Sequence, residues 1–444
     1  MGSPRADDGR REAKATRWCA VTGGRGFMAR HLVAALLRSG EWHVRVTDLA
    51  PSLVLGPGET EDLLRGALGD GRAVYASVDV CNLKQLTADE ASRRAKIKIR
   101  GVYCMHNHDC IRFQNHLLDS QISCPIQSLQ AGNDLRMKSF SNVIKLPITR
   151  GDDTSIPAFE GVDVVFHTAA ADPSKNDLQL HYKVNVEGTK NVIDACKICK
   201  VKRLIHTSSS GVVFDGVHGL FDVNESLPYP DKFPDAYAQT KAEAEKLVIK
   251  TNCINDLLTC CLRPGAIFGP GDKVIPFLDH HGWTHVTIGD GKNCDDFVYV
   301  ENVVHGHLCA DKTLATMEGA KTSGGKAYFI TNMEPMNMWD FTYLVQQELG
   351  YKRIPKIRIP TVFIKPASYL IEWAYMFVFS NFGIRQPQML TPARIKYITL
   401  NRTSSCNKAI EELGYKPIVT LKDGLKKAVK VYIEMRNKDF SKRE

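Results

Sequence analysis

A tyrosine and a lysine four residues apart form the pattern in this chain best suited to acid–base chemistry. The segment Tyr237-Ala-Gln-Thr-Lys241 places a phenol and an ammonium on the same face of a helix. A nearby positive charge favours the phenolate, so we expect the pKa of Tyr237 to fall from about 10 toward the working pH. Such a phenol can remove the proton of an alcohol while a hydride leaves the same carbon. The pair therefore predicts redox chemistry at an alcohol carbon.

A row of hydroxyl groups precedes this pair in the chain. It follows an apolar run and reads Thr207-Ser208-Ser209-Ser210. One of these serines can hydrogen-bond the substrate oxygen whose proton the tyrosine removes. The hydroxyl row and the phenol together predict one catalytic site.

A glycine-rich turn near the N-terminus predicts where a nucleotide binds. Gly23, Gly26 and Ala29 recur at three-residue spacing between an apolar run and a helix. Such a turn lets a pyrophosphate approach the backbone and the positive end of the helix dipole. Asp48 closes the next apolar run, His43 to Thr47, at the distance where an acid binds the ribose diol of NAD. The segment favours a dinucleotide cofactor.

The elements that must position these groups alternate along the chain. Helical patterns, such as 26–39 closed by Gly40 and 186–199, lie between apolar runs that read as strands. The alternation predicts an α/β fold with a Rossmann-type doubly wound parallel sheet from 17 to about 310. The looser pattern of 311–444 predicts mainly a smaller C-terminal substrate lobe. The predicted strands are 18–22, 43–47, 73–78, 162–167, 203–207 and 257–262.

Composition excludes several classes of protein. The 444 residues carry a net charge of +9, but residues 90–147 hold nine Lys/Arg against four Asp/Glu, so we expect no nucleic-acid surface. Thirteen scattered cysteines and a charged tail at 1–16 without an apolar stretch predict reduced thiols facing the cytosol. Cys196 and Cys199 form a CxxC pair within an expected helix, far from any second pair, and we expect no metal there.

Two segments interrupt the alternation. Between the expected Rossmann parts 17–89 and 158–310, residues 90–157 lack periodicity, and we interpret them as a disordered insertion. A zinc site among their Cys and His residues fits no standard spacing. Residues 361–383 are apolar but carry Lys365, Pro366 and Glu372, which argues against a membrane-spanning helix. This segment could lie in the membrane interface, line an apolar substrate pocket or form an ordinary buried helix.

The motifs together resemble the extended short-chain dehydrogenases/reductases and, within them, the 3β-hydroxysteroid dehydrogenases. The resemblance covers about 17–90 and 157–435, and it is closest to the plant branch that oxidises and decarboxylates sterol 4α-carboxylates. The matching segments are 22–27, 79–80, 167–170, 185–189, 207–214, 237–241, 263–272, 296–303 and 328–335.

The resemblance implies NAD as the cofactor. Asp48 would bind the adenosine ribose and repel a 2′-phosphate, Asp79 would meet the adenine, and Pro264 would lie by the carboxamide. The glycine-rich turn would hold the pyrophosphate, and Ala169 and Ala170 would pass under the cofactor. The residues expected to bind NAD are Gly23, Gly26, Phe27, Met28, Asp48, Asp79, Ala169, Ala170, Tyr237, Lys241 and Pro264.

The resemblance also implies the catalytic residues and the reaction. Tyr237 would be the base, Lys241 would bind the nicotinamide ribose and tune it, and Ser209, with Ser210 as the alternative, would be the active serine. The expected activity is NAD-dependent oxidation of the 3β-hydroxyl of a 4α-carboxysterol to the 3-ketone with loss of CO2. Sterol acids partition into bilayers, so we expect the protein to lie at the cytosolic face of the endoplasmic reticulum membrane, with residues 361–383 as the contact. A homodimer is also compatible with the resemblance.

Two other functions fit parts of the pattern. A nucleotide-sugar epimerase or dehydratase would share every cofactor motif, but the apolar segment 361–383 suits a sugar nucleotide poorly. A non-catalytic NAD-binding module would tolerate a disrupted fold but has no need of Ser209, Tyr237 and Lys241.

Overall fold

A seven-stranded parallel sheet forms the centre of the molecule. The computed structural model describes residues 17–53, 55, 59–87, 158–175, 177–281, 286–352, 357–377 and 390–440. The strand order is β12-β7-β5-β4-β1-β2-β3, and every neighbouring pair is parallel. The strands are β1 (Arg17–Thr22), β2 (Trp42–Asp48), β3 (Ala73–Ser77), β4 (Val164–His167), β5 (Arg203–Thr207), β7 (Leu258–Pro264) and β12 (Lys326–Ile330).

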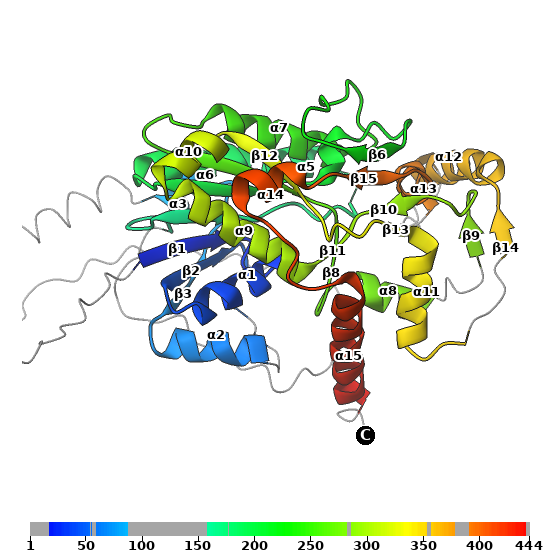
Figure 1. The fold of residues 1–444 in the computed structure, drawn as a ribbon, viewed down its shortest axis with the longest axis horizontal. Coiled ribbons are helices and arrows are strands. Elements are labelled where there is room, and N and C mark those ends of the chain that lie inside the picture. Colours follow the sequence, from blue (N-terminus) through cyan, green and yellow to red (C-terminus); the bar gives the residue numbers. More distant parts are fainter. Residues whose placement is uncertain are drawn as a thin grey trace, which may run out of the picture.

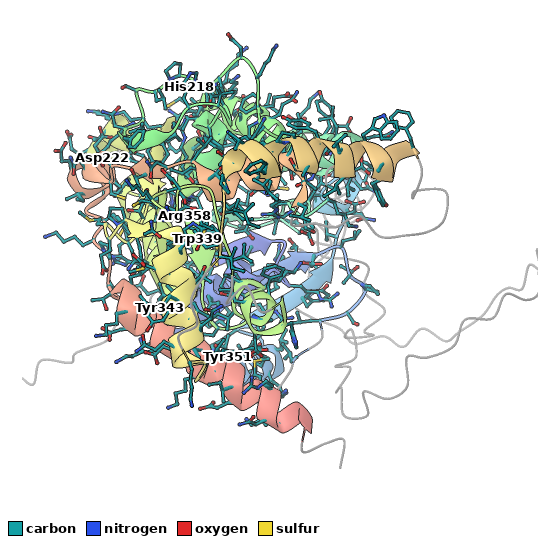
Figure 2. The ribbon with its side chains drawn as sticks, turned by 90° about the vertical axis from the view of Figure 1, so that its right-hand side faces the viewer. His218, Asp222, Trp339, Tyr343, Tyr351 and Arg358 are labelled. Carbon is teal, nitrogen blue, oxygen red and sulfur yellow. The ribbon has the colours of Figure 1, made fainter. Side chains whose placement is uncertain are left out.

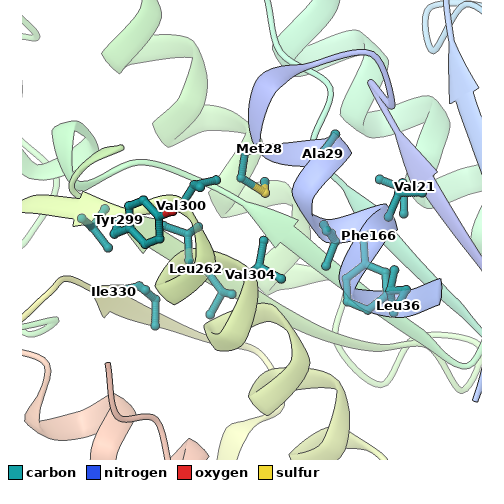
Figure 3. Packing of buried hydrophobic residues seen from close by; sticks show 14 of the residues in the cluster. Val21, Met28, Ala29, Leu36, Phe166, Leu262, Tyr299, Val300, Val304 and Ile330 are labelled. Carbon is teal, nitrogen blue, oxygen red and sulfur yellow. The ribbon is translucent and has the colours of Figure 1, made fainter. Parts of the chain in front are cut away.

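Helices cover both faces of this sheet, as its alternating side chains require. In β1, Cys19 and Val21 belong to one hydrophobic core, whereas Ala20 between them belongs to another. The first core includes α1 and α9, whose packing on the strands is shown in Figure 3. The second includes α6 and the end of α7. These helices are α1 (Phe27–Arg38), α2 (Glu59–Gly69), α3 (Leu83–Leu86), α6 (Gly188–Ile198), α7 (Ala236–Lys250) and α9 (Val300–Leu314).

A second lobe is built from segments far apart in the sequence. Its four-stranded sheet has the order β13-β10-β15-β6, and two further strand pairs, β8 with β11 and β9 with β14, form separate two-stranded sheets. Figure 1 shows β1 to β3 at one end of the molecule and α12 and α13 at the other. The strands are β6 (Leu220–Val223), β8 (Ala266–Phe268), β9 (Val286–Ile288), β10 (Cys294–Asp295), β11 (Phe297–Tyr299), β13 (Met336–Asn337), β14 (Ile357–Ile359) and β15 (Arg402–Ser404).

The remaining helices frame this lobe and the sheet edges. In Figure 1, α15 projects from the body and ends near the C-terminus. These helices are α5 (Leu178–His181), α8 (Val274–His281), α10 (Met317–Ser323), α11 (Met338–Glu348), α12 (Thr361–Phe377), α13 (Pro392–Thr399), α14 (Asn407–Leu413) and α15 (Leu421–Phe440).

The fold class expected from the sequence is confirmed, and its six strands recur within a few residues of their expected ends. The chain is partitioned differently at the C-terminal side. Residues 326–330, in the range assigned mainly to the substrate lobe, form the edge strand β12 of the central sheet, whereas β6 and β10 from the earlier range lie in the lobe. The tail 1–16 and the segment 90–157, with its zinc alternative, lie outside the described residues.

Candidate functional site

The glycine-rich turn follows β1, which lies next to β4 in the sheet. Strand order reverses between these two strands, because β2 and β3 lie on one side of β1 and all later strands lie on the other. Gly23 has φ +66°, and a Cβ there would lie 2.7 Å from the Ala169 Cα atom. The Gly26 N–H donates to the Gly23 carbonyl at 2.8 Å, and α1 begins at the next residue, Phe27, with Met28 buried behind it. Only glycine fits the position of Gly23, so the turn can lie directly against the backbone of Ala169.

Gly24, the middle glycine, has no predicted role from the sequence. A Cβ there would lie 2.3 Å from Val46 Cγ1, so Gly24 allows the turn to pack on β2. Helix α1 has no acidic residue in its first turn and no side-chain cap at Gly26. Its N-terminal N–H groups are therefore free to meet an anion.

Two acids flank this turn at the carboxyl ends of neighbouring strands. Asp48 ends β2 and accepts hydrogen bonds from the backbone N–H of Arg25 at 3.0 Å and of Ala50 at 3.3 Å. Asp79 follows β3 and accepts from the Cys81 N–H at 2.9 Å. The first bond fixes the Asp48 carboxylate against the glycine-rich turn itself.

The other expected cofactor positions lie along the same edge of the sheet. The Ala169 N–H donates to Thr22 Oγ1 at 3.3 Å, and Ala170 beside it is exposed. Pro264 is the last residue of β7 and pairs in register with Ile330 of β12. The hydroxyl row follows β5, which lies between β4 and β7. Ala169 and Ala170 follow β4 on one side of it, and Pro264 ends β7 on the other.

Helix α7 carries Tyr237 and Lys241. Asp235 caps the helix by accepting the Ala238 N–H at 2.8 Å. Lys241 is 2% exposed, and its Nζ donates to the Thr207 carbonyl at 2.6 Å and contacts His206 Nε2 at 3.3 Å. Burial lowers the pKa of Lys241 to about 8.

The expectation that the pKa of Tyr237 falls rests on positive charges near the phenol, and the groups that this chain itself supplies act in the opposite direction. Burial raises the pKa of Tyr237 to about 12, the charge of Asp235 adds to the increase, and a hydrogen bond with the Ser209 hydroxyl opposes it. Lys241 is directed to β5, where His206 and Thr207 accept its hydrogen bonds. Spacing on a helix predicted that the two side chains share a face but not which partner the ammonium takes.

The three serines of the hydroxyl row have different surroundings. Ser209 interacts with Tyr237 and accepts the Gly211 N–H at 3.1 Å. Ser210 lines a small cavity beside Arg402 of β15, and the buried Ser208 hydroxyl has no hydrogen-bond partner within the described part of the chain. Of the two alternatives from the sequence, Ser209 is the one in contact with the phenol.

A buried polar network links the glycine-rich strand to α7, and the sequence analysis assigned none of its members a role. His167 faces Thr22 Oγ1 at 2.8 Å and Thr189 Oγ1 at 2.9 Å through its two ring nitrogens. The Thr189 hydroxyl donates to the Asn185 carbonyl at 2.5 Å, and Asn185 Nδ2 donates to Thr240 Oγ1 at 3.0 Å. Asn185 lies in a π-helical turn, Tyr182–Glu187, of the kind found at functional sites.

Tyr397 of α13 also reaches the site and has no counterpart in the sequence analysis. Its hydroxyl hydrogen-bonds Asp235 and would lie 3.8 Å from a Cβ on Gly211. The Arg402 guanidinium lies 4.7 Å from the centre of the Tyr397 ring. Tyr397 therefore brings α13 close to the residues around Tyr237, although α13 is far from them in sequence.

Two features bear on other ligands. Among the described residues, no three His, Cys, Asp or Glu side chains are grouped so that they could hold a metal ion. A cavity of about 380 Å³ opens between α8 and α15, and its lining includes neither Tyr237 nor Ser209. This cavity is therefore separate from the candidate site at the sheet edge and α7.

The fold and this arrangement of side chains define an extended short-chain dehydrogenase/reductase. Solved structures with the same fold include a dTDP-glucose 4,6-dehydratase from Streptomyces venezuelae with NAD bound, at a TM-score of 0.57 and 18% identity, covering 94% of this chain and 98% of that one. A UDP-galactose 4-epimerase matches with the same TM-score and identity over 94% of this chain and 99% of that one. At this identity the likeness concerns the fold alone.

The chain belongs to the 3-beta hydroxysteroid dehydrogenase/isomerase family, which it matches over residues 20–123 and 128–361. It is 41% identical over 433 residues to 3beta-hydroxysteroid-dehydrogenase/decarboxylase isoform 1 of Arabidopsis thaliana, covering 96% of this chain and 82% of that protein. Isoform 2 is equally similar, but the chain spans only 64% of it. The human sterol-4-alpha-carboxylate 3-dehydrogenase, decarboxylating, is 39% identical over 63% of this chain and 74% of its own.

Proposed function

We propose that this protein oxidises the 3β-hydroxyl of a 4α-carboxysterol to the 3-ketone, with NAD as the hydride acceptor, and that the product loses CO2. The contact between Ser209 and Tyr237 at the carboxyl edge of the sheet carries the proposal, because the two hydroxyls can share one substrate oxygen. Membership of the dehydrogenase family and the names of its relatives support the substrate class.

The residues of the turn fit a dinucleotide. Gly23 lets the turn lie directly against the Ala169 backbone, where a Cβ would clash, and the uncapped start of α1 offers its N–H groups to a pyrophosphate. The Asp48 carboxylate is suited to a ribose diol and would repel a 2′-phosphate, which favours NAD over NADP. We assign NAD binding to the eleven positions named in the sequence analysis, and NAD when bound supplies the hydride acceptor and a positive charge on the nicotinamide.

The first chemical step is proton removal by Tyr237. The phenolate oxygen takes the proton of the C3 hydroxyl while Ser209 donates a hydrogen bond to the substrate oxygen, and the hydride leaves C3. The chain's own groups raise the pKa of this phenol to about 12, and the positive charge of a bound nicotinamide would favour the phenolate. Activity in the oxidative direction is therefore expected to rise with pH.

The second step needs no additional base. The 3-ketone with a carboxylate on C4 is a β-keto acid, so the bond from C4 to the carboxylate breaks and its electrons form an enolate on the C3 oxygen. The protonated Tyr237 and Ser209 donate hydrogen bonds to that oxygen, and C4 then takes a proton. The same two hydroxyls thus serve oxidation and decarboxylation.

The proposal is tested with the purified full-length chain, NAD and a 4α-carboxy-3β-hydroxysterol. We expect NADH to form and a ketone lighter by CO2 to accumulate, and we expect no NADH with the same sterol lacking the 3β-hydroxyl. A chain that binds NAD but turns over no 3β-hydroxysterol acid would instead support a non-catalytic module. Turnover of a nucleotide sugar would support the epimerase or dehydratase alternative.

We also propose that α12 contacts a bilayer surface. One face of this helix exposes apolar side chains at helical spacing, and Arg358 and Lys365 add exposed positive charge beside it. Figure 2 views the molecule from this side, with Arg358 labelled. Among the helices described, none is long and apolar enough to cross a membrane. The exposed side chains are Val362, Phe363, Tyr369, Leu370, Trp373 and Phe377.

This exposure favours a surface contact over an ordinary buried helix in the described part of 361–383. A sterol acid dissolved in a bilayer would meet the protein at such a surface, so the contact suits the proposed substrate. Localisation at the cytosolic face of the endoplasmic reticulum membrane and a homodimer stay predictions.

The membrane contact is tested by flotation with phosphatidylcholine vesicles that contain an anionic lipid. Phe363→Glu is expected to reduce the bound fraction strongly, whereas Phe221→Glu is the matched control because both side chains are 69% exposed and Phe221 lies on β6. Equal binding by the two variants would contradict the assignment of α12.

A further inference from the structure

We propose that His206 is a positioning residue for Lys241, fixing the ammonium at the end of β5 by accepting one of its hydrogen bonds. The inference deepens the proposed function, on which it rests for the role of Lys241. His206 is fully buried and precedes the hydroxyl row, and its Nε2 lies 3.3 Å from Lys241 Nζ.

The ammonium is held from two adjacent residues of one strand. Lys241 Nζ donates to the Thr207 carbonyl at 2.6 Å and to His206 Nε2, and an ammonium has three N–H donors. Two donors directed at β5 leave the third for a hydroxyl of a bound ligand. His206 thereby sets the direction in which Lys241 can reach a ligand.

The ring of His206 must be neutral and of one tautomer for this contact. An ammonium only donates, so Nε2 accepts and the ring proton lies on Nδ1. Burial and the positive charge of Lys241 lower the pKa of His206 well below its usual range, which keeps the ring neutral. The buried Nδ1 has no hydrogen-bond partner among the residues that the structure describes.

An unsatisfied buried donor disfavours histidine at this position on grounds of stability. The two residues before His206 on β5, Leu204 and Ile205, are apolar and fully buried. The observation that distinguishes position 206 is its contact with Lys241. We infer that histidine is present there for that contact and not for packing.

Other groups hold His206 and its neighbour in place. The His167 ring lies 5.1 Å from the His206 ring and is fixed by hydroxyls of β1 and α6. His307 of α9 contacts Thr207 Oγ1 at 2.7 Å and the Val303 carbonyl at 2.8 Å, which steadies the residue whose carbonyl accepts from Lys241.

The ionisable groups that face Lys241 from the surrounding elements define its titration. They are His206 on β5 and His167 on β4, both with a pKa lowered by burial, together with the Cys261 thiol on β7 and Glu245 on α7. His307 on α9, whose pKa burial also lowers, faces His206. The Glu245 carboxylate is paired with Arg263. Of these groups, His206 is the one that hydrogen-bonds the ammonium.

The test compares His206→Leu, which removes the acceptor, with His206→Gln, whose side-chain oxygen can replace Nε2. Ile205→Val is the control for a small change in the same buried strand. The first readout is the pKa of Lys241, measured by NMR with lysine labelled at Cε and assigned with Lys241→Arg, and it requires no turnover.

We expect the pKa of Lys241 to fall in His206→Leu, because a hydrogen bond to the charged form is lost, and to return toward that of the unmodified chain in His206→Gln. We expect kcat for sterol oxidation to fall at least tenfold in His206→Leu, with a shifted pH profile and a smaller change in KM, and to be restored in part by His206→Gln.

An unchanged Lys241 pKa in His206→Leu, or a His206→Gln variant that behaves like His206→Leu, would overturn the inference. If His206→Leu does not fold, the pKa of Lys241 in His206→Gln decides. A Lys241 pKa in His206→Gln that falls as far as expected for a lost acceptor would also overturn the inference. A chain that oxidises no sterol would refute the proposed function while leaving the NMR result to decide on His206.

Discussion

The backbone contact between Gly23 and Ala169 offers a quantitative test of the cofactor turn. Gly23→Ala places a side chain at φ +66°, which costs about 1–2 kcal/mol for a residue other than glycine. The added Cβ would lie 2.7 Å from Ala169 Cα and 3.0 Å from its nitrogen, so the backbone that follows β4 must also move. Overpacking of this kind costs about 1–3 kcal/mol. We expect a total loss of about 2–5 kcal/mol in the free energy of unfolding.

Gly40 supplies a matched control. It has φ +67°, but a Cβ there would meet no atom within 4 Å. Gly40→Ala should therefore lose only the conformational part, about 1–2 kcal/mol. The difference between the two variants measures the contact with Ala169.

Urea denaturation of both variants gives the stabilities, and calorimetric titration gives the Kd for NAD. Because relief of the clash moves the backbone on which the pyrophosphate would rest, we expect Kd to rise at least tenfold in Gly23→Ala, equivalent to about 1.4 kcal/mol, and to be unchanged in Gly40→Ala. The reasoning is refuted if the two variants lose the same stability and bind NAD equally well.

Three further predictions address the charges. Asp48→Asn should weaken NAD binding and reduce the preference for NAD over NADP, as measured from the two Kd values, because the carboxylate no longer repels a 2′-phosphate; an unchanged preference would contradict its role. Glu245→Leu should cost about 3–5 kcal/mol in urea denaturation because it leaves the buried Arg263 unpaired, and Arg263→Met in the same chain should recover part of the loss. Burial raises the pKa of Asp296 to about 7, so between about pH 4 and 7 the folded chain holds a proton that the unfolded chain releases. The stability contributed by this group therefore falls as pH rises through that window, and Asp296→Asn should flatten the dependence; an identical slope would assign it to other groups.

The sequence predicted the parts of the fold that depend on local pattern. Alternating apolar runs and helical patterns predicted six strands of the central sheet, and the glycine spacing predicted the turn after β1. The seventh strand, β12, was missed because its place beside β7 is a long-range pairing that follows a run of helices. The second lobe draws its four strands from residues 220 to 404, and no local pattern indicates such pairings.

The site shows the same division between local and long-range information. Spacing predicted that Tyr237 and Lys241 share a helix face, but the hydrogen bonds of Lys241 to β5 and the raised pKa of Tyr237 depend on burial by distant segments. His206 and Tyr397 contact residues far away in sequence. Asn185 could have been predicted as part of the buried polar network, because the segment 185–189 was already recognised as a motif.

The most direct test of the central claim is the amount of CO2 released per NADH formed. A 4α-carboxysterol labelled with ¹³C in its carboxylate is incubated with NAD and the full-length chain, and ¹³CO2 is measured by mass spectrometry beside NADH absorbance. Tyr237→Phe is run in parallel with its NAD affinity. The account predicts one CO2 for each NADH and loss of both products in Tyr237→Phe, which still binds NAD. Unchanged turnover in Tyr237→Phe, or CO2 released without NADH, would contradict it.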